Sequence, residues 1–577
     1  MITYTLEMPK PSTHVFEVTM NVDGVEKDST LDVLLPVWRS GRYVILDFAG
    51  GIVAFNANDA NKRKLDWSKI DKSTWRIETR GAANITIRYQ VYANEFGMRT
   101  RGLNDDRAFV DGTAVFMYVK KYADLPVRLR VVPFGDWHVT TGLSPVRGER
   151  NTFSALNYEH LADCPLEIGT QKDYIFEVDG KEHVLSISGE GNFHPDTLIK
   201  DISRIINTQM EFWGSLPYDR YVFLLALSPS IGGGTEHLNS CVLCSHPFVF
   251  ANPDSYRSFL GLISHEFFHT WNVKQLRPAA IDRYDWSREN YAKEFWIAEG
   301  TTSYYDDLLL ARAGYLSEQK SLERVAEMIN ADVARPGNTR QSLTEASYDA
   351  WIKYGKEGQH AYNFETDYYG RGAAVSFALD MTIRKLTENR KSLDDVMRAM
   401  LAKFPRGRGG YTVADFQKIS EEIAGASLKQ FFDDYVDGVS PIPWDKLLAV
   451  VGLEREPKIA EQQPWLGLAT VDEGQRTRVT NVVAGSPAYA AGVDINDEIL
   501  ALNGYRVRSA DLRSRIAEMK DGEKVKLTVF RDSRLREFEI ELKYPDYPDQ
   551  KVVKTEPFAD DKAAVFKSWI GLLDRVK

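Results

Sequence analysis

Two histidines four residues apart carry the strongest chemical signal in the sequence. His265 and His269 flank Glu266 in the segment SHEFFHTW, within a stretch of helical periodicity. Residues at positions i and i+4 share one face of a helix, so both imidazoles can point at a single metal ion. The carboxylate between them lies alongside, where it can activate water. The spacing therefore predicts a metal site on a helix, with Glu266 as the catalytic base.

A catalytic zinc site needs a third protein ligand and one open position. The segment WIAEGTTSYYDD supplies Glu299, which follows His269 by 30 residues (299 minus 269). That separation allows a loop to return a second helix antiparallel to the first. Two histidines and one glutamate are the ligand set of thermolysin-type enzymes, so the sequence predicts one zinc ion per chain. An ordinary amphipathic helix with surface histidine and glutamate does not account for the further segments described below.

Length and charge limit the architecture and the partners. A chain of 577 residues is too long for one hydrophobic core, because domains hold about 150 residues each. The formal charge of -10 gives no field that would attract a polyanion, so we expect peptides rather than nucleic acid as partners.

Targeting signals are weak in this sequence. No apolar run approaches the roughly 18 residues that span a bilayer, so no membrane span is expected. The first residues, MITYTLEMPK, lack the basic start and apolar core of a secretory signal. A cytoplasmic location is therefore expected, or a periplasmic or secreted one if a signal peptide has been removed.

Hydrophobic patterning divides the chain into regions rich in strands and regions rich in helices, which predicts a multidomain α+β protein. In residues 1–180, alternation such as that of NITIRYQVYA predicts an N-terminal β-sandwich. Residues 181–455 are α-rich, with a small sheet expected from YVFLLAL and the glycines at 232–234. Strand patterning returns in residues 462–545, and a tail over 546–577 contains an apolar stretch expected to pack back as a helix.

These segments resemble the glycyl aminopeptidase family of gluzincin zinc metallopeptidases that end in a PDZ domain. LPVWRSGRY (35–43) is similar to the Pro-x-Trp-x-x-Gly-x-Tyr signature of the family's N-terminal domain, and the segments around the three ligands match its metal-binding segments. GGGTEH (232–237) stands where related aminopeptidases carry Gly-x-Met-Glu-Asn, and YGRG (369–372) resembles their Tyr-x-Lys-Gly. The resemblance covers nearly the whole chain and implies a thermolysin-like catalytic domain.

The resemblance of GGGTEH and YGRG implies residues that bind the substrate and stabilise its intermediate. An aminopeptidase must recognise a free ammonium, and Glu236 could do so by a charge-assisted hydrogen bond, with Gly234 and His237 beside it. Tyr369 would donate to the oxyanion of the tetrahedral intermediate, and Tyr368 is a near competitor for that role. His237 replaces the family's Asn, and it could donate to the substrate carbonyl, orient Glu236 or be structural.

Residues 462–545 resemble a PDZ domain of the bacterial protease type, through WLGL, GSPAYAAGV and NDEILALNG. Trp465–Leu468 would form its carboxylate-binding loop, so Gly467 and Leu468 are predicted to contact the C-terminus of a bound peptide. The alternative is a PDZ domain that only packs on the catalytic domain.

Together these inferences predict a zinc-dependent aminopeptidase that removes N-terminal glycine or alanine from peptides. The bulk of His237 and Tyr368 is expected to narrow the pocket for the first side chain. Two alternatives are an endopeptidase of the same clan, which would not need a free amine, and a catalytically silent PDZ scaffold.

Overall fold

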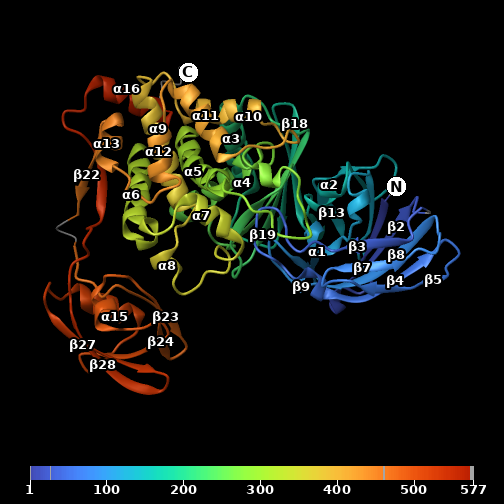
Figure 1. The fold of residues 1–577 in the computed structure, drawn as a ribbon, viewed down its shortest axis with the longest axis horizontal. Helices are drawn as coiled ribbons and strands as arrows, with labels where there is room; N and C mark the ends of the chain where they lie inside the picture. The colour runs from blue at the N-terminus through green and yellow to red at the C-terminus, as the bar shows by residue number, and fades with distance from the viewer. Residues whose placement is uncertain (1, 26, 459–461, 572–577) are drawn as a thin grey trace. The chain divides into compact units, whose positions relative to one another are not determined.

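The computed structural model describes residues 2–25, 27–458 and 462–571 of the chain, which form two compact units (Figure 1). Unit 1 consists of Met1–Ala292, Tyr305–Tyr315 and Arg398–Thr412. Unit 2 consists of Lys293–Tyr304, Leu316–Met397 and Val413–Lys577. Among the described residues, no helix has the length and apolar composition needed to cross a membrane.

Strands with alternating buried side chains build the N-terminal part of unit 1, as the sequence pattern predicts. In β8 (Asn84–Tyr92) every second residue is buried, and the strand pairs with β2 (Val15–Asp23) and β4 (Ile52–Asp59). These strands belong to an eight-stranded sheet that also contains β14 (Ser144–Pro145), β15 (Thr152–Ala155), β12 (Val127–Val132), β1 (Ile2–Glu7) and β5 (Lys64–Leu65). A three-stranded sheet of β3 (Thr30–Leu34), β7 (Thr74–Glu78) and β6 (Trp67–Lys69) and a further five-stranded sheet complete this β-rich domain.

A second five-stranded sheet in unit 1 carries the segment GGGTEH at its edge. Its order is β17 (Lys172–Val178), β18 (Lys181–Ser188), β19 (Arg220–Leu227), β21 (Ser240–Ser245) and β20 (Gly233–Glu236). The buried strand and the small sheet expected from YVFLLAL are thereby confirmed. The border expected at residue 180 falls within a β17–β18 hairpin, because Asp179 and Gly180 both have positive φ and form a two-residue turn. This turn joins two strands of one sheet and does not separate two domains.

Helices α3 (Pro195–Trp213) and α4 (Pro253–Phe268) pack on each other and on this sheet. The side chain of Asn252 caps α4 by accepting hydrogen bonds from the backbone N–H groups of residues 254 and 255, and Pro253 occupies the first turn. The helix ends at Phe268, within the segment SHEFFHTW that the sequence predicts to be helical. Beyond that point the ring of His269 bonds to the carbonyl of Asn272 at 2.7 Å, which holds the chain in a tight turn.

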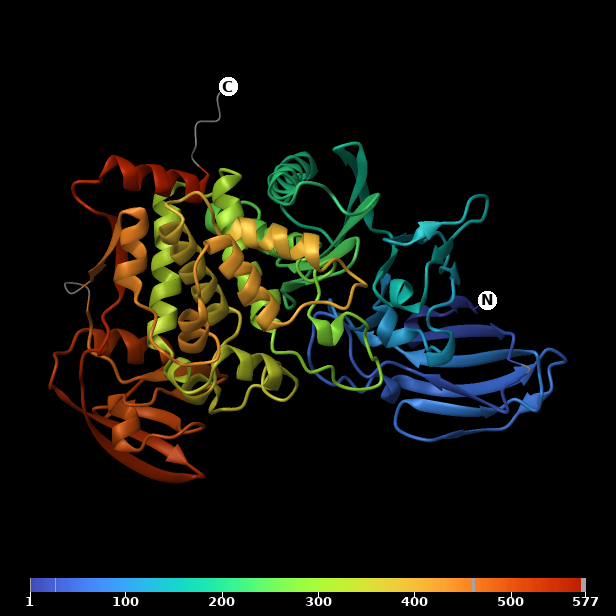
Figure 2. The same ribbon diagram turned by 45° about the horizontal axis from the view of Figure 1, so that its top comes forward.

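Unit 2 has a helical body in which α6 (Glu318–Ala334) and α9 (Gly370–Leu386) lie side by side (Figures 1 and 2). The end of the chain packs onto this body. Strand β29 (Gln550–Lys554) pairs with β22 (Leu453–Pro457), and α16 (Asp560–Ile570) confirms the helix expected there. The indole N–H of Trp569, on α16, donates to the hydroxyl of Tyr304 at 2.9 Å.

The remaining part of unit 2 is a small β domain with two helices, α14 (Pro487–Ala491) and α15 (Ser509–Ala517). Its sheet contains β23 (Leu468–Glu473), β24 (Arg476–Val482), β25 (Glu498–Leu502), β26 (Tyr505–Arg506), β27 (Lys524–Arg531) and β28 (Arg534–Glu541). The alternation expected at 525–529 is confirmed, because Val525, Leu527 and Val529 all lie in its core.

Candidate metal centre

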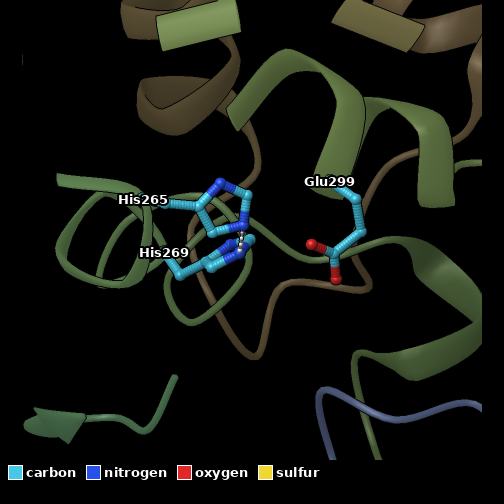
Figure 3. Close-up of side chains that lie close together, drawn as sticks. All are labelled: His265, His269 and Glu299. Carbon is cyan, nitrogen blue, oxygen red and sulfur yellow. Dashed lines mark hydrogen bonds between the residues drawn. The ribbon is translucent and has the colours of Figure 1, made fainter. Parts of the chain in front are cut away.

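His265, His269 and Glu299 come together in the structure. One ligand atom from each of them lies within 4.8 Å of those of the other two. Figure 3 shows the two imidazoles from the α4 segment with the Glu299 carboxylate turned toward them.

Hydrogen bonds fix the tautomer of both imidazoles. Nδ1 of His265 donates to the carboxylate of Asp306 at 3.0 Å, and Nδ1 of His269 donates to the carbonyl of Asn272 at 2.7 Å. Each Nε2 is then left without a proton, which is the form of imidazole nitrogen that binds a metal. Asp306 is a residue that sequence reasoning missed, although the aspartates at the end of WIAEGTTSYYDD were a signal for a carboxylate partner.

The distance between the two Nε2 atoms tests whether this donor set fits zinc. They lie 3.1 Å apart, and neither can donate a hydrogen bond to the other once both protons are on Nδ1. Two nitrogens bound to one tetrahedral zinc at about 2.0–2.1 Å are about 3.3 Å apart. The pair is therefore placed as zinc requires, and Glu299 offers the third donor.

Glu299 lies on a π-helical turn, Trp296–Gly300, which leads directly into α5 (Thr301–Arg312). Such turns are frequent at functional sites because they redirect a side chain. Gly300 is required here, since a Cβ atom would lie 2.5 Å from the Cα of Gly372 and 2.6 Å from the carbonyl oxygen of Tyr368. The sequence predicted an ordinary helix at this point.

Glu266 has the burial expected of a base. Burial raises the pKa of its carboxyl to about 7, while the charges of His265, His269 and Arg99 act in the opposite direction. A base with a pKa near neutrality can accept and return a proton efficiently. Gly234 leaves room for this carboxylate, because a Cβ at that position would lie 2.3 Å from Oε1 of Glu266.

Glu236, at the end of β20, lies beside the base and a predicted ligand. Ligand atoms of Glu236, Glu266 and His269 all lie within 4.8 Å of one another, and all three side chains are buried. Gly41, from the segment LPVWRSGRY, packs against the Glu236 carboxylate so closely that a Cβ would lie 2.4 Å from Oε2. This arrangement places the Glu236 carboxylate beside the candidate base and a candidate metal ligand.

His237 belongs to a buried charge network. Its Nδ1 lies 3.2 Å from Oδ1 of Asp163, its Nε2 lies 3.4 Å from a guanidinium nitrogen of Arg39, and Lys274 Nζ lies 2.9 Å from the same Asp163 oxygen. Burial lowers the pKa of His237, although Asp163 partly opposes that effect. Because Asp163 and Arg39 engage both ring nitrogens, the contacts favour the structural role among the three open possibilities. Sequence reasoning missed Arg39, Asp163 and Lys274 as members of this network.

Tyr368 and Tyr369 stack on each other at 5.1 Å between ring centroids, and Tyr354 stacks on Tyr369 and packs at a tilt against Tyr368. Tyr368 is buried and Tyr369 half-buried, and the backbone of Tyr368 contacts Gly300 next to Glu299. Both hydroxyls thus stay candidates for the oxyanion role.

In the small β domain, the loop of residues 465–468 precedes the edge strand β23, which lies beside α15. Gly467 has a φ of +76°, and a Cβ there would lie 2.1 Å from Cβ of Ser486. Its carbonyl accepts a hydrogen bond from the N–H of Val483 at 2.8 Å. Leu468 is half-buried against the domain core. The positive φ and the close contact with Ser486 therefore require glycine at position 467.

Comparisons with known proteins agree with this organisation. Family models match residues 3–170 (Peptidase M61 N-terminal domain), 258–375 (M61 glycyl aminopeptidase) and 464–542 (PDZ domain). A crystal structure of an aminopeptidase N family protein from Idiomarina loihiensis is 26% identical, with a TM-score of 0.92 over 99% of this chain and 100% of that one. The M1 zinc metallopeptidase from Deinococcus radiodurans shares the fold at 15% identity and a TM-score of 0.50, over 77% of this chain and 95% of that one.

Curated relatives match over a short stretch only. The periplasmic pH-dependent serine endoprotease DegQ of Escherichia coli is 37% identical over 97 residues, which are 17% of this chain and 20% of DegQ. A probable periplasmic serine endoprotease DegP-like of Pseudomonas putida is 30% identical over 115 residues, 18% of this chain and 24% of that protein. The chain thus spans between a fifth and a quarter of these relatives' length.

The fold, the donor set and these matches define a zinc metallopeptidase that acts on peptides. More narrowly, the chain belongs to the M61 glycyl aminopeptidase family and carries a PDZ domain.

Proposed function

We propose that this zinc aminopeptidase removes N-terminal glycine or alanine from peptides. The observation that carries the proposal is the position of Glu236 beside Glu266 and His269, with ligand atoms within 4.8 Å. A carboxylate so close to the reacting centre binds a free ammonium by a charge-assisted hydrogen bond. It thereby limits cleavage to the first peptide bond.

His265, His269 and Glu299 would hold one zinc ion per chain. When bound, zinc polarises a carbonyl and makes water more acidic. Asp306 supports this role, because its carboxylate keeps the proton on Nδ1 of His265 and leaves Nε2 as the ligand atom.

Glu266 acts as the base in this proposal. It takes a proton from the attacking water and passes it to the nitrogen of the leaving amine as the carbon–nitrogen bond breaks. Tyr369 donates a hydrogen bond to the oxyanion, and Tyr368 is the alternative donor.

The description of the matching family as glycyl aminopeptidases supports a preference for N-terminal glycine. Glu236 holds the ammonium while the adjacent carbonyl is at the reacting centre, so the first side chain has a fixed direction. A narrow pocket then rejects larger side chains by overlap, which discriminates better than the roughly 1–3 kcal/mol of a missing methylene.

Two other functions are disfavoured by particular residues. An endopeptidase has no use for a buried carboxylate at the position of Glu236. A silent scaffold would lack the base or a ligand, whereas Glu266 and all three ligands are present.

For the PDZ domain, we propose a groove between β23 and α15 that takes the C-terminus of a peptide at Gly467 and Leu468.

The test is a set of 4-nitroanilides of glycine, alanine and leucine, each with a free and an acetylated amine. We expect glycine and alanine to exceed leucine in kcat/KM and the acetylated compounds to resist cleavage. Equal cleavage of acetylated substrates would favour the endopeptidase, and faster cleavage of the leucine compound would refute the narrow pocket.

A further inference from the structure

Two arginines beside the candidate site form no ion pair with an acidic residue among the residues that the structure describes. Arg99 uses Nη2 to donate to the carbonyl of Gly234 at 2.9 Å, but its Nε is buried and has no hydrogen-bond partner. The side chain of Arg42 is partly buried and makes no hydrogen bond or ion pair in that part of the chain. Neighbouring Arg39, in contrast, pairs with Asp111 at 2.8 Å.

Arg99 and Arg42 each lie next to a residue that contacts one of the two buried carboxylates of the candidate site. Arg99 is attached to β20 at Gly234, and Gly234 packs against the carboxylate of Glu266. Arg42 directly follows Gly41, which packs against the carboxylate of Glu236. Arg99 is therefore bonded directly to β20, and Arg42 adjoins the residue that packs on the carboxylate at the end of this strand.

The two positive charges also lie close to each other. Burial lowers the pKa of Arg42, and the charges of Arg99 and Arg39 lower it further. Guanidinium groups nevertheless stay protonated in proteins, so the repulsion persists unless an anion relieves it. A carboxylate is the natural partner, because its two oxygens match the donor geometry of a guanidinium.

We propose that Arg42 and Arg99 form a subsite for a carboxylate of the substrate. This inference rests on the proposed aminopeptidase function and adds a second recognised charge to the ammonium held by Glu236. The carboxylate is either the C-terminal carboxyl of a short peptide or an acidic side chain that follows the first residue. The enzyme would accordingly favour substrates with an anionic group near the cleaved bond.

Matched pairs of substrates distinguish a C-terminal carboxyl from an acidic side chain as the group that binds. Gly-Ala is compared with Gly-Ala amide to test the terminal carboxyl, and Gly-Asp amide is compared with Gly-Asn amide to test the side chain. For at least one pair we expect the wild-type kcat/KM to favour the charged substrate by at least about tenfold, the scale of a charge-assisted hydrogen bond. Raising the salt concentration should reduce that ratio by screening.

Substitutions then assign the preference to these two residues. In Arg42→Gln and Arg99→Gln, the ratio of charged to neutral kcat/KM should fall by about tenfold. Arg88→Gln, on an exposed position of β8, removes the same charge and should leave the ratio unchanged.

Two outcomes would overturn the subsite: a wild-type ratio near one for both substrate pairs, or a ratio that both substitutions leave intact. A loss shared equally by charged and neutral substrates would mean that the arginines only stabilise the buried carboxylates. Failure of the aminopeptidase proposal is a different result, namely no cleavage of Gly-Ala amide by the wild type.

Discussion

At the scale of single residues, the candidate base is a different residue from the three candidate metal ligands. Glu266 is buried without being one of the three ligands, and Gly234 shapes the space around its carboxylate. Glu266→Gln should therefore keep zinc and lower kcat by at least about 10²-fold, the usual scale for loss of a positioned base. Glu299→Ala should instead lose zinc. Metal analysis of the two variants measures whether zinc is kept, and kcat on glycine 4-nitroanilide measures turnover. Near-normal turnover of Glu266→Gln would contradict the assigned base.

Asp306 gives a second prediction at this scale. Its hydrogen bond to Nδ1 of His265 selects the tautomer that can bind metal. Asp306→Ala should weaken zinc affinity by about 10–100-fold, the usual cost of losing such a partner. Asp307→Ala removes the neighbouring carboxylate and serves as the control. Zinc titration in competition with a chelator measures the affinity, and equal affinities of the two variants would contradict this role.

At the scale of elements, strand β20 combines Glu236 with the glycine that makes room for Glu266. Gly234→Ala should lower kcat at least about tenfold, because displacement of a catalytic group by about 1 Å can cost 10²-fold. The control is Gly232→Ala, since a Cβ there would meet no atom within 4 Å and the backbone is unstrained. If Gly234→Ala kept wild-type kcat, the described packing of β20 on α4 would be wrong.

The buried network around Asp163 joins four separate segments of unit 1. Burial by itself would raise the pKa of Asp163, yet the charges of Lys274 and His237 hold it well below its usual range. Asp163→Asn should lower the free energy of unfolding by about 3–5 kcal/mol, because it removes the nearer carboxylate partner of the buried Lys274 charge and leaves only Glu236 at 4.0 Å. Urea denaturation at neutral pH measures this loss.

The pH dependence of that loss follows from the direction of the shift. A carboxyl whose pKa is lowered on folding contributes its stability above the unfolded pKa of about 3.9, and loses it as the pH falls toward the folded value. The stability difference between wild type and Asp163→Asn should therefore be largest above about pH 5 and shrink at lower pH. A difference that grew on acidification would contradict the ion pair.

Features that depend on residues close together in the sequence could be predicted, and most features that depend on contacts between distant segments could not. The spacing of His265 and His269 is local, so it predicted both the helix and its ligand face. Asp163, Arg99 and Asp306 could not be assigned, because their roles depend on contacts between segments that are distant in sequence. The helix end at Phe268 was missed for a local reason, since the turn depends on the bond from the His269 ring to a backbone carbonyl.

At the scale of the whole molecule, the donor set predicts about one zinc ion per chain. Removal of zinc by a chelator should abolish peptidase activity and lower Tm, because a metal that binds only the folded state stabilises it. Elemental analysis before and after chelation, with activity restored by added zinc, provides the measurement. Full activity of protein free of transition metals would rule the zinc site out.

The pairing of β22 with β29 has a consequence for anyone who would separate the PDZ domain from the enzyme. These strands lie immediately before and after the PDZ domain, with Pro457 opposite Gln550 in the ladder. The domain is therefore an insertion whose two ends meet, and not an appendage at the end of the chain. A truncation at residue 457 would also delete α16 and the Trp569 contact with Tyr304. Only internal excision, with a short turn joining β22 to β29, leaves the helical body complete.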